Sequence, residues 1–264
     1  NCELEFISLQ NLKNMFMKQM KFFLVALMAV VMGMSVTSCM NGDDNGPQTL
    51  SVIARLDYYN SSFKMMDGTK LVPTDPSSIM LLNSGMYIVN GQYNQEDVNV
   101  STASITLTLT STPTKIDGAA VTSMEQTPDA AIYALDYQNV YPFLFDKNTL
   151  IVPAMIWSKG TTNAEVAEDV KKHTVYITYD EIKEGDTELV LNLSDVISED
   201  KTEKRAVLTI VHQSYDLTSV ISQFDGKLKK ITIKAKVNGE NNKLDDANYT
   251  KDGKFEIDYS KITQ

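Results

Sequence analysis

The chain has 264 residues with 24 basic and 34 acidic side chains, which give a formal net charge of −10. This balance disfavours a nucleic-acid partner, which needs lysine and arginine to displace counterions, and it disfavours electrostatic adhesion to anionic lipid. The only two cysteines are Cys2 and Cys39, so the rest of the chain holds no disulfide framework and no cysteine-based zinc site.

Residues 1–38 read as upstream sequence followed by a secretory signal peptide. Lys18 and Lys21 precede an apolar core at 22–34, and small polar residues then lead to Cys39. The core has 13 residues, and at about 1.5 Å per residue it would span roughly 20 Å, short of the ~30 Å hydrocarbon layer. We therefore expect a cleaved signal that starts at Met17 or Met20, rather than an uncleaved membrane anchor.

Cys39 is the predicted lipidation site. Residues 36–39 read Val-Thr-Ser-Cys, a loose form of the box that precedes the lipidated cysteine of bacterial lipoproteins. One acyl chain binds a membrane only marginally, so stable anchoring needs more than one. We predict that a covalent lipid such as palmitate on Cys39 holds the exported chain to a membrane, and we expect no other cofactor.

The mature chain from Cys39 has 226 residues, with 21 basic and 32 acidic side chains. That length suits one large β domain or two modest ones. Residues 39–47 are polar, contain Asp43 and Asp44, and are predicted to form a flexible acidic tether. Pro113 and Pro128 interrupt the later pattern, so we place an N-terminal domain at 48–120 and a C-terminal domain at 121–264.

Beyond the tether, apolar residues alternate with polar ones, as they do in half-buried strands. Such runs occupy residues 52–58, 98–109, 173–179, 189–193 and 231–237. Pairs that favour tight turns are Asp67-Gly68, Asn90-Gly91, Asp117-Gly118, Asp225-Gly226, Asn238-Gly239 and Asp252-Gly253. The pattern predicts an antiparallel all-β body with two short helices, one after the capping box at 162–165 and one over 217–224.

Residues 150–157 are apolar on both faces. This is typical of a strand buried on both sides or at a domain interface, and we favour the interface. Pro153 argues against a central position in a sheet, unless a bulge accommodates it, because it has no N–H to donate.

The only histidines are His173 and His212, each in an alternating run. If their strands paired, the imidazoles could approach and form a metal or acid/base site with a carboxylate; we favour the alternative that both are ordinary strand residues. The chain has no Gly-x-Ser-x-Gly, His-Glu-x-x-His or phosphate-loop motif. We predict no catalytic, metal-binding or cofactor-binding residue, but the many acids leave a glycosidase pair open.

Two further groups have a functional and a structural interpretation. Residues 241–248 with Asp252 and Gly253 are rich in oxygen ligands for calcium, but Thr250 breaks the spacing of an EF-hand, so we expect a solvated loop. An aromatic group could stack on sugars or a peptide if exposed, but we expect it to be core. Its members are Tyr137, Tyr141, Phe143, Phe145 and Trp157.

The chain resembles the NigD-like lipoproteins of Bacteroides-type bacteria. The resemblance lies in Ser38-Cys39 followed by Asp43-Asp44, in residues 67–73, and in residues 212–216. It implies a small OB-like β-barrel followed by a β-sandwich in an outer-membrane lipoprotein. Acids just after the lipidated cysteine imply the cell surface rather than the periplasmic face. The family brings no activity, although its name, from a bacteriocin gene cluster, suggests immunity or envelope protection.

We therefore expect a non-enzymatic, lipid-anchored envelope protein with a protein or surface-glycan partner. A nucleic-acid partner is not expected, because residues 48–130 hold four basic and eight acidic side chains. The four are Arg55, Lys64, Lys70 and Lys115. The alternatives are an envelope glycan hydrolase that uses two carboxylates, and a bacteriocin-related immunity or envelope-protection protein.

Overall fold

The computed structural model describes residues 46–123, 127–199, 203–240 and 248–262. Cys39 and the predicted signal peptide lie outside these ranges. None of the described helices is long and apolar enough to cross a membrane. The described residues divide into two compact units: 46–84 with 88–114 form the N-terminal unit, and 85–87 with the described residues from 115 to 262 form the C-terminal unit.

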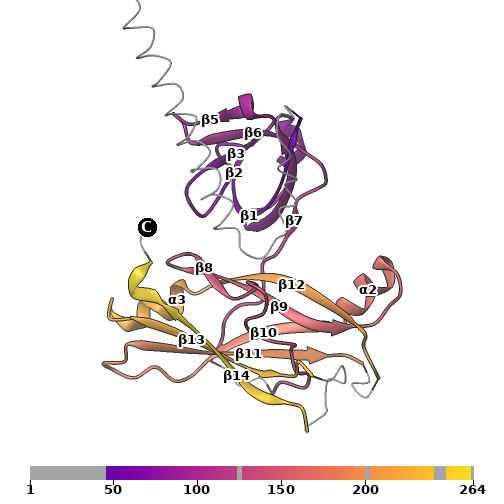
Figure 1. The fold of residues 1–264 in the computed structure, drawn as a ribbon. Coiled ribbons are helices and arrows are strands. Elements are labelled where there is room, and N and C mark those ends of the chain that lie inside the picture. Colours follow the sequence, from indigo (N-terminus) through magenta and orange to yellow (C-terminus); the bar gives the residue numbers. More distant parts are fainter. Residues whose placement is uncertain (1–45, 124–126, 200–202, 241–247, 263–264) are drawn as a thin grey trace, which may run out of the picture. The chain divides into compact units, whose positions relative to one another are not determined.

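The N-terminal unit is built on a small β-barrel (Figure 1). Its strands follow the order β5-β6-β3-β2-β1-β4-β7, and β6 also pairs with β4, which closes the barrel. The elements are β1 (Gln48–Asp57), β2 (Ser62–Lys64), β3 (Lys70–Pro73), η1 (Pro76–Ile79), β4 (Met86–Tyr93), η2 (Gln95–Asp97), β5 (Val98–Asn99), β6 (Ser104–Leu109) and β7 (Thr114–Lys115). The predicted all-β class, with a barrel before a second β module, is confirmed.

Local chemistry explains the barrel strands. Alternate residues of β1 are buried, as the period-two pattern predicts. The turn before β3 is the predicted Asp67-Gly68 turn: Gly68 has φ +89°, and the Asp67 carboxylate accepts the N–H of Thr69 at 2.9 Å. The turn predicted at Asn90-Gly91 is wrong, because Gly91 lies inside β4, where a Cβ would collide with Leu107.

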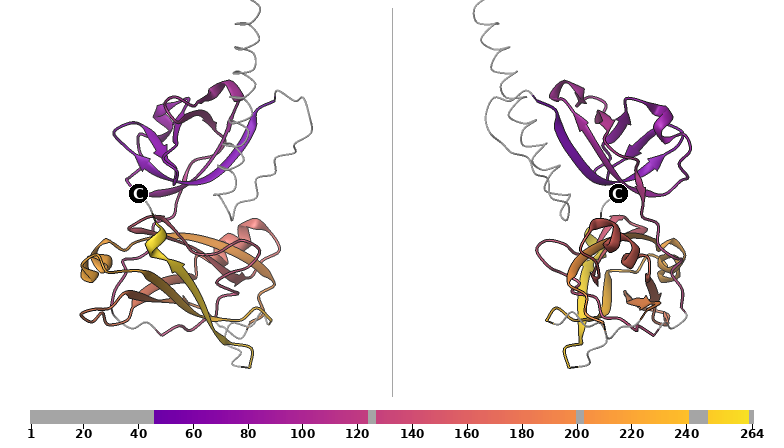
Figure 2. Two further views of the ribbon diagram at one scale, coloured as in Figure 1. Left: turned by 60° about the vertical axis from the view of Figure 1, so that its left-hand side comes forward. Right: turned by 90° about the vertical axis from the view of Figure 1, so that its right-hand side faces the viewer.

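The C-terminal unit is a two-layered sandwich (Figure 2). One sheet has the order β12-β9-β8 and the other has the order β10-β11-β13-β14. Their facing side chains form one apolar core that includes Val152 and Ile156 from one sheet and Ile177 and Ile233 from the other. The strands are β8 (Phe143–Asp146), β9 (Thr149–Ser158), β10 (His173–Tyr179), β11 (Glu188–Ile197), β12 (Val207–Asp216), β13 (Lys230–Val237) and β14 (Lys251–Asp258).

Both predicted helices are present as connectors: α2 (Asn163–Val170), and α3 (Thr218–Ile221) followed by η3 (Ser222–Phe224). A further 3-10 turn, η4 (Tyr259–Lys261), follows β14. The capping box is formed as predicted: the Thr162 hydroxyl accepts from the Glu165 N–H, and the Glu165 carboxylate accepts from the Thr162 N–H.

The body is not purely antiparallel. β11 pairs with β13 in parallel, and β3 pairs with β6 in parallel. Parallel neighbours need a long connection, and the chain between β11 and β13 supplies one by passing through β12 in the other sheet and then α3. The turn predicted at Asp252-Gly253 is also wrong, since Gly253 lies inside β14, where a Cβ would stand 2.6 Å from Val237 Cγ1.

The expectation that Pro153 keeps its strand out of a central position is wrong. β9 lies between β8 and β12 and is buried along nearly all its length. Tyr133 donates its N–H to the carbonyl of Met155 at 2.7 Å, on the side of β9 away from β12. Pro153, two residues earlier, turns its N to the same side. β8 pairs with β9 only as far as Ile151, so Pro153 removes no ladder bond.

Candidate functional site

A buried polar cluster lies in the C-terminal unit, around α2 and the starts of β10 and β12. It contains Asp169, His173, Asp195 and Arg205, and the side chain of Arg205 is fully buried. The Arg205 Nε lies 3.5 Å from Asp169 Oδ2, which also accepts the N–H of Lys159 at 2.7 Å. Buried charges persist only when paired in this way, because leaving water costs several kcal/mol per ion.

His173 and Asp195 form the inner part of this cluster. Both occupy core-facing positions of adjacent strands, and His173 Nδ1 lies 2.8 Å from Asp195 Oδ2. Burial raises the pKa of Asp195, and the hydrogen bond from His173 opposes that rise. Both side chains are at most 1% exposed, so the pair has the geometry of an oriented imidazole but no access for a substrate.

Partly exposed ion pairs surround the buried ones. Lys159 Nζ lies 2.9 Å from Glu199, and Lys172 also pairs with Glu199. The hydrogen bonds from Lys172 and Lys159 lower the pKa of Glu199 to about 2. Arg205 Nη2 lies 3.8 Å from the same carboxylate, so Glu199 links the two partly exposed lysines to the buried arginine.

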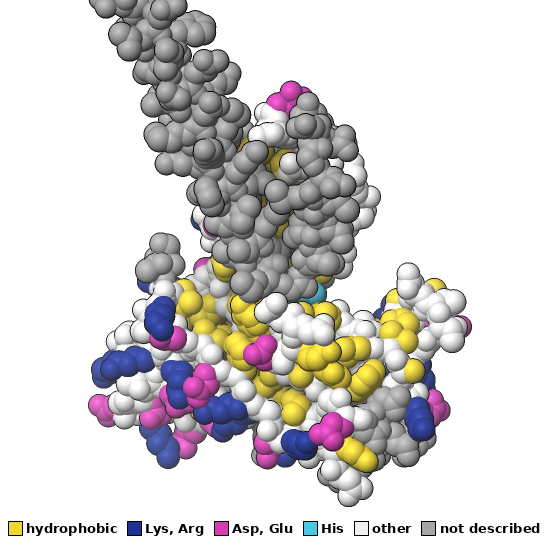
Figure 3. Space-filling view, viewed as in Figure 1, with side chains coloured by type: hydrophobic (Ala, Val, Ile, Leu, Met, Phe, Trp, Pro, Cys, Tyr) yellow, Lys and Arg dark blue, Asp and Glu magenta, His cyan; other side chains and the backbone are white. Residues whose placement is uncertain are grey.

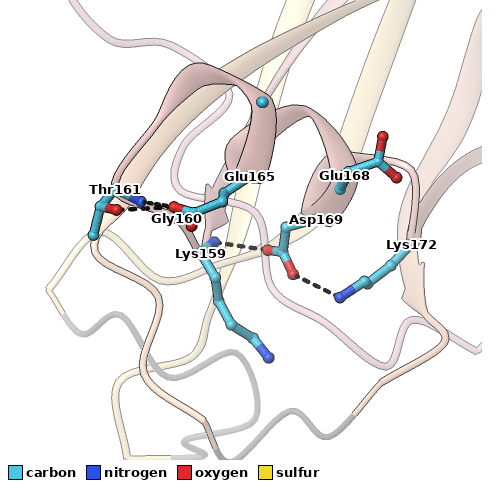
Figure 4. A pocket seen from close by; sticks show the side chains of 8 residues that line it. Lys159, Gly160, Thr161, Glu165, Glu168, Asp169 and Lys172 are labelled. Carbon is cyan, nitrogen blue, oxygen red and sulfur yellow. Dashed lines mark hydrogen bonds and ion pairs between the residues drawn. The ribbon is translucent and has the colours of Figure 1, made fainter.

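A groove of about 620 Å³ lies beside α2, and Figure 4 shows the side chains that line it. Its acids are all engaged: Glu165 accepts from the N–H and hydroxyl of Thr161, Glu168 pairs with Lys171, and Asp169 accepts from Lys159. The hydrogen bonds from Thr161 lower the pKa of Glu165. A glycosidase needs one carboxylic acid with a raised pKa, and the pKa of Glu165 is shifted in the opposite direction.

The structure does not bring the two histidines together. In the described part of the chain, β10 and β12 belong to different sheets, and His212 stands opposite Pro153 on β9. Burial lowers the pKa of His212. Sequence reasoning missed Asp195 as the partner of His173. The signal was present, because Asp195 continues the core-facing alternation of Leu191 and Leu193.

The aromatic residues divide into two groups rather than one core. Tyr133 packs edge-on against both Tyr137 and Trp157, with ring centroids 5.1 and 5.5 Å apart. Tyr141 stacks on Phe255 at 5.6 Å. Phe145 is buried, as expected for core, and Phe143 is half-buried, but Tyr137 is 38% exposed.

An apolar strip crosses the outer face of the three-stranded sheet. Opposite residues of antiparallel strands share a face, so Leu208, which pairs with Trp157, lies beside it on that face. We define the strip as Ile210, Leu208, Trp157, Tyr133 and Tyr137; Ile210, like Tyr137, is 38% exposed. Figure 3 shows one face of this unit, on which hydrophobic side chains gather with charged groups around them.

Most of the candidate calcium ligands belong to residues 241–247, which lie outside the described residues. Cys39, the predicted lipidation site, also lies outside them. Elsewhere, in the described residues, no group of three or more histidine, cysteine or acidic side chains is placed to hold a metal ion.

Comparison with known proteins gives a structural relationship. No protein-family model and no curated protein matches the chain. The structure of a candidate lipoprotein from Bacteroides fragilis matches with 28% identity and a TM-score of 0.67, over 80% of this chain and 98% of that one. A protein of unknown function from Bacteroides vulgatus matches with 14% identity and a TM-score of 0.52, over 80% of this chain and 91% of that one, which shows a shared fold.

Proposed function

We propose that the chain is a NigD-like lipoprotein, anchored to the outer membrane by acyl chains on Cys39, that binds a partner without catalysing a reaction. The similarity to a candidate lipoprotein over 98% of that protein's length supports the anchor. Asp43 and Asp44, four and five residues after the lipidation site, favour the cell surface over the periplasmic face.

The exposed apolar strip is the observation that carries the binding role. Aromatic side chains with one polar end are favoured at binding surfaces, and Tyr137 presents such a side chain to solvent. The titratable groups near the groove have partners of their own, and the buried imidazole is enclosed, which supports binding over catalysis. A protein or a surface glycan fits the strip.

The test is affinity capture from native envelopes with the lipid-anchored protein. We expect the wild type to recover one stoichiometric partner. Tyr137→Ala should recover at least tenfold less of this partner, because the strip makes the contact. Tyr59→Ala is the matched control, since Tyr59 is a 98% exposed tyrosine of the N-terminal unit. Equal recovery by all three proteins, or recovery of no partner, would contradict the proposal.

A further inference from the structure

One edge of the sandwich offers unpaired backbone groups. Ser214 of β12 donates to the carbonyl of Ile116 at 2.6 Å and accepts from Gly118 at 2.8 Å, so its N–H and C=O point away from β9. The backbone N–H and C=O groups of successive strand residues point alternately to the two sides of the strand. Those of Leu208, Ile210 and His212 therefore point to the same edge as those of Ser214. Among the residues that the structure describes, β12 pairs with β9 alone over this stretch.

The other long edges of the two sheets are protected. β14 carries Lys251, Asp252, Lys254, Glu256 and Asp258 along its length. On β10, Thr122 pairs with residues 177 and 179, and the Tyr215 hydroxyl donates to the carbonyl of Val175 at 3.1 Å. Natural proteins use charges and covering segments of this kind to stop an edge strand from pairing with another chain.

Within the described ranges, β12 has no such protection at residues 207–213. This stretch contains no lysine, arginine, aspartate or glutamate, and it is rich in β-branched residues. Its one titratable side chain is His212, whose pKa burial lowers, so the stretch is neutral at pH 7. A long, uncharged, β-forming edge is the usual template for an added strand.

The same edge already accepts a short added strand. Residues 116–118 pair in parallel with Ser214, which shows that a second backbone fits beside β12. A strand added farther along would place alternate side chains over Leu208 and Ile210, next to Trp157. A single bound segment would therefore make main-chain hydrogen bonds to β12 and apolar contacts with the strip.

We propose that the edge of β12 at residues 208–212 binds an extended segment of a partner protein, which adds to the sheet as a further strand with its apolar side chains on the strip. This inference rests on the proposed binding function and names its partner class. The occupant is another protein rather than a second copy, because each mature copy carries 21 basic and 32 acidic side chains, a net charge of −11, and two would repel.

The experiment uses the mature chain with Cys39→Ser, so that it is free of lipid, and a short synthetic peptide of alternating threonine and valine. Trp157 is the only tryptophan in the chain and lies opposite Leu208, one strand in from the edge, so its fluorescence reports occupancy. We expect saturable binding that is lost when every second residue of the peptide is N-methylated. Ile210→Pro, which removes one outward N–H, should weaken binding by about fivefold.

Several outcomes would overturn the inference: equal binding of both peptides, no binding of either, or displacement of the peptide by a soluble glycan. If the free chain formed a concentration-dependent dimer, and Ile210→Pro abolished that dimer, the occupant of the edge would be a second copy and not a partner protein. Thr174→Lys, an exposed position of the other sheet, is the control for surface changes. The peptide comparison remains decisive if Ile210→Pro fails to fold, and it is independent of partner capture from envelopes.

Discussion

Replacing Arg205 with methionine should destabilise the C-terminal unit by about 3–5 kcal/mol, because a buried charge loses its partner. Arg205 is fully buried and lies 3.5 Å from Asp169, which is itself 2% exposed. Without the guanidinium, the Asp169 carboxylate stays in a poorly solvated site and keeps only the Lys159 N–H and the partly exposed Lys172 Nζ, 3.6 Å away. Urea unfolding followed by Trp157 fluorescence measures the loss.

The matched control is the double variant Arg205→Met with Asp169→Asn. Asparagine keeps an acceptor for the Lys159 N–H and removes the charge, so the double variant should recover most of the lost free energy of unfolding. A single variant within about 1 kcal/mol of the wild type would show that the buried pair does not hold this end of the sandwich.

Replacing Tyr215 with alanine should cost about 3–5 kcal/mol, as for other buried aromatic side chains. Tyr215 is 1% exposed, and its hydroxyl donates to the Val175 carbonyl across the core. Its ring packs so closely on Gly118 that a Cβ there would stand 2.7 Å from the ring. The truncation therefore leaves a cavity under residues 116–118, and the same fluorescence-detected unfolding measures it.

Tyr215→Phe separates packing from hydrogen bonding. It keeps the ring and removes only the hydroxyl, so the expected cost is about 1 kcal/mol. If phenylalanine proves as destabilising as alanine, then the hydroxyl and not the packed ring holds β12 to β10.

Hydrophobic alternation predicts the strands well because burial on one face is a local property. The bounds it predicts for β1, β10, β11 and β13 agree with the observed bounds to within a few residues, and the capping box predicts the start of α2. Glycine is a less reliable predictor of turns, because it has different roles at different positions. Gly68 forms a turn, whereas Gly91 lies inside a strand where a neighbouring strand comes too close for a side chain. The parallel pairing of β11 with β13 depends on β12 leaving for the other sheet, which no local pattern encodes.

The candidate site shows the same division. Asp195 could be found from its place in the alternation of β11, but Arg205 could not, because its burial depends on a loop that lies against Asp169. The apolar strip depends on register: Leu208 meets Trp157 only because β12 and β9 pair with that offset, and a shift of one residue would turn Leu208 to the other face.

The central claim is that a lipid on Cys39 places this binding protein in the cell envelope. The most direct measurement is fractionation of cells that make the wild type or Cys39→Ser, with lipid attachment followed by labelled palmitate. We expect the wild type to be labelled and to sediment with membranes, and the variant to be unlabelled and released. If the serine variant were retained in the membrane fraction to the same extent as the wild type, the account would be wrong.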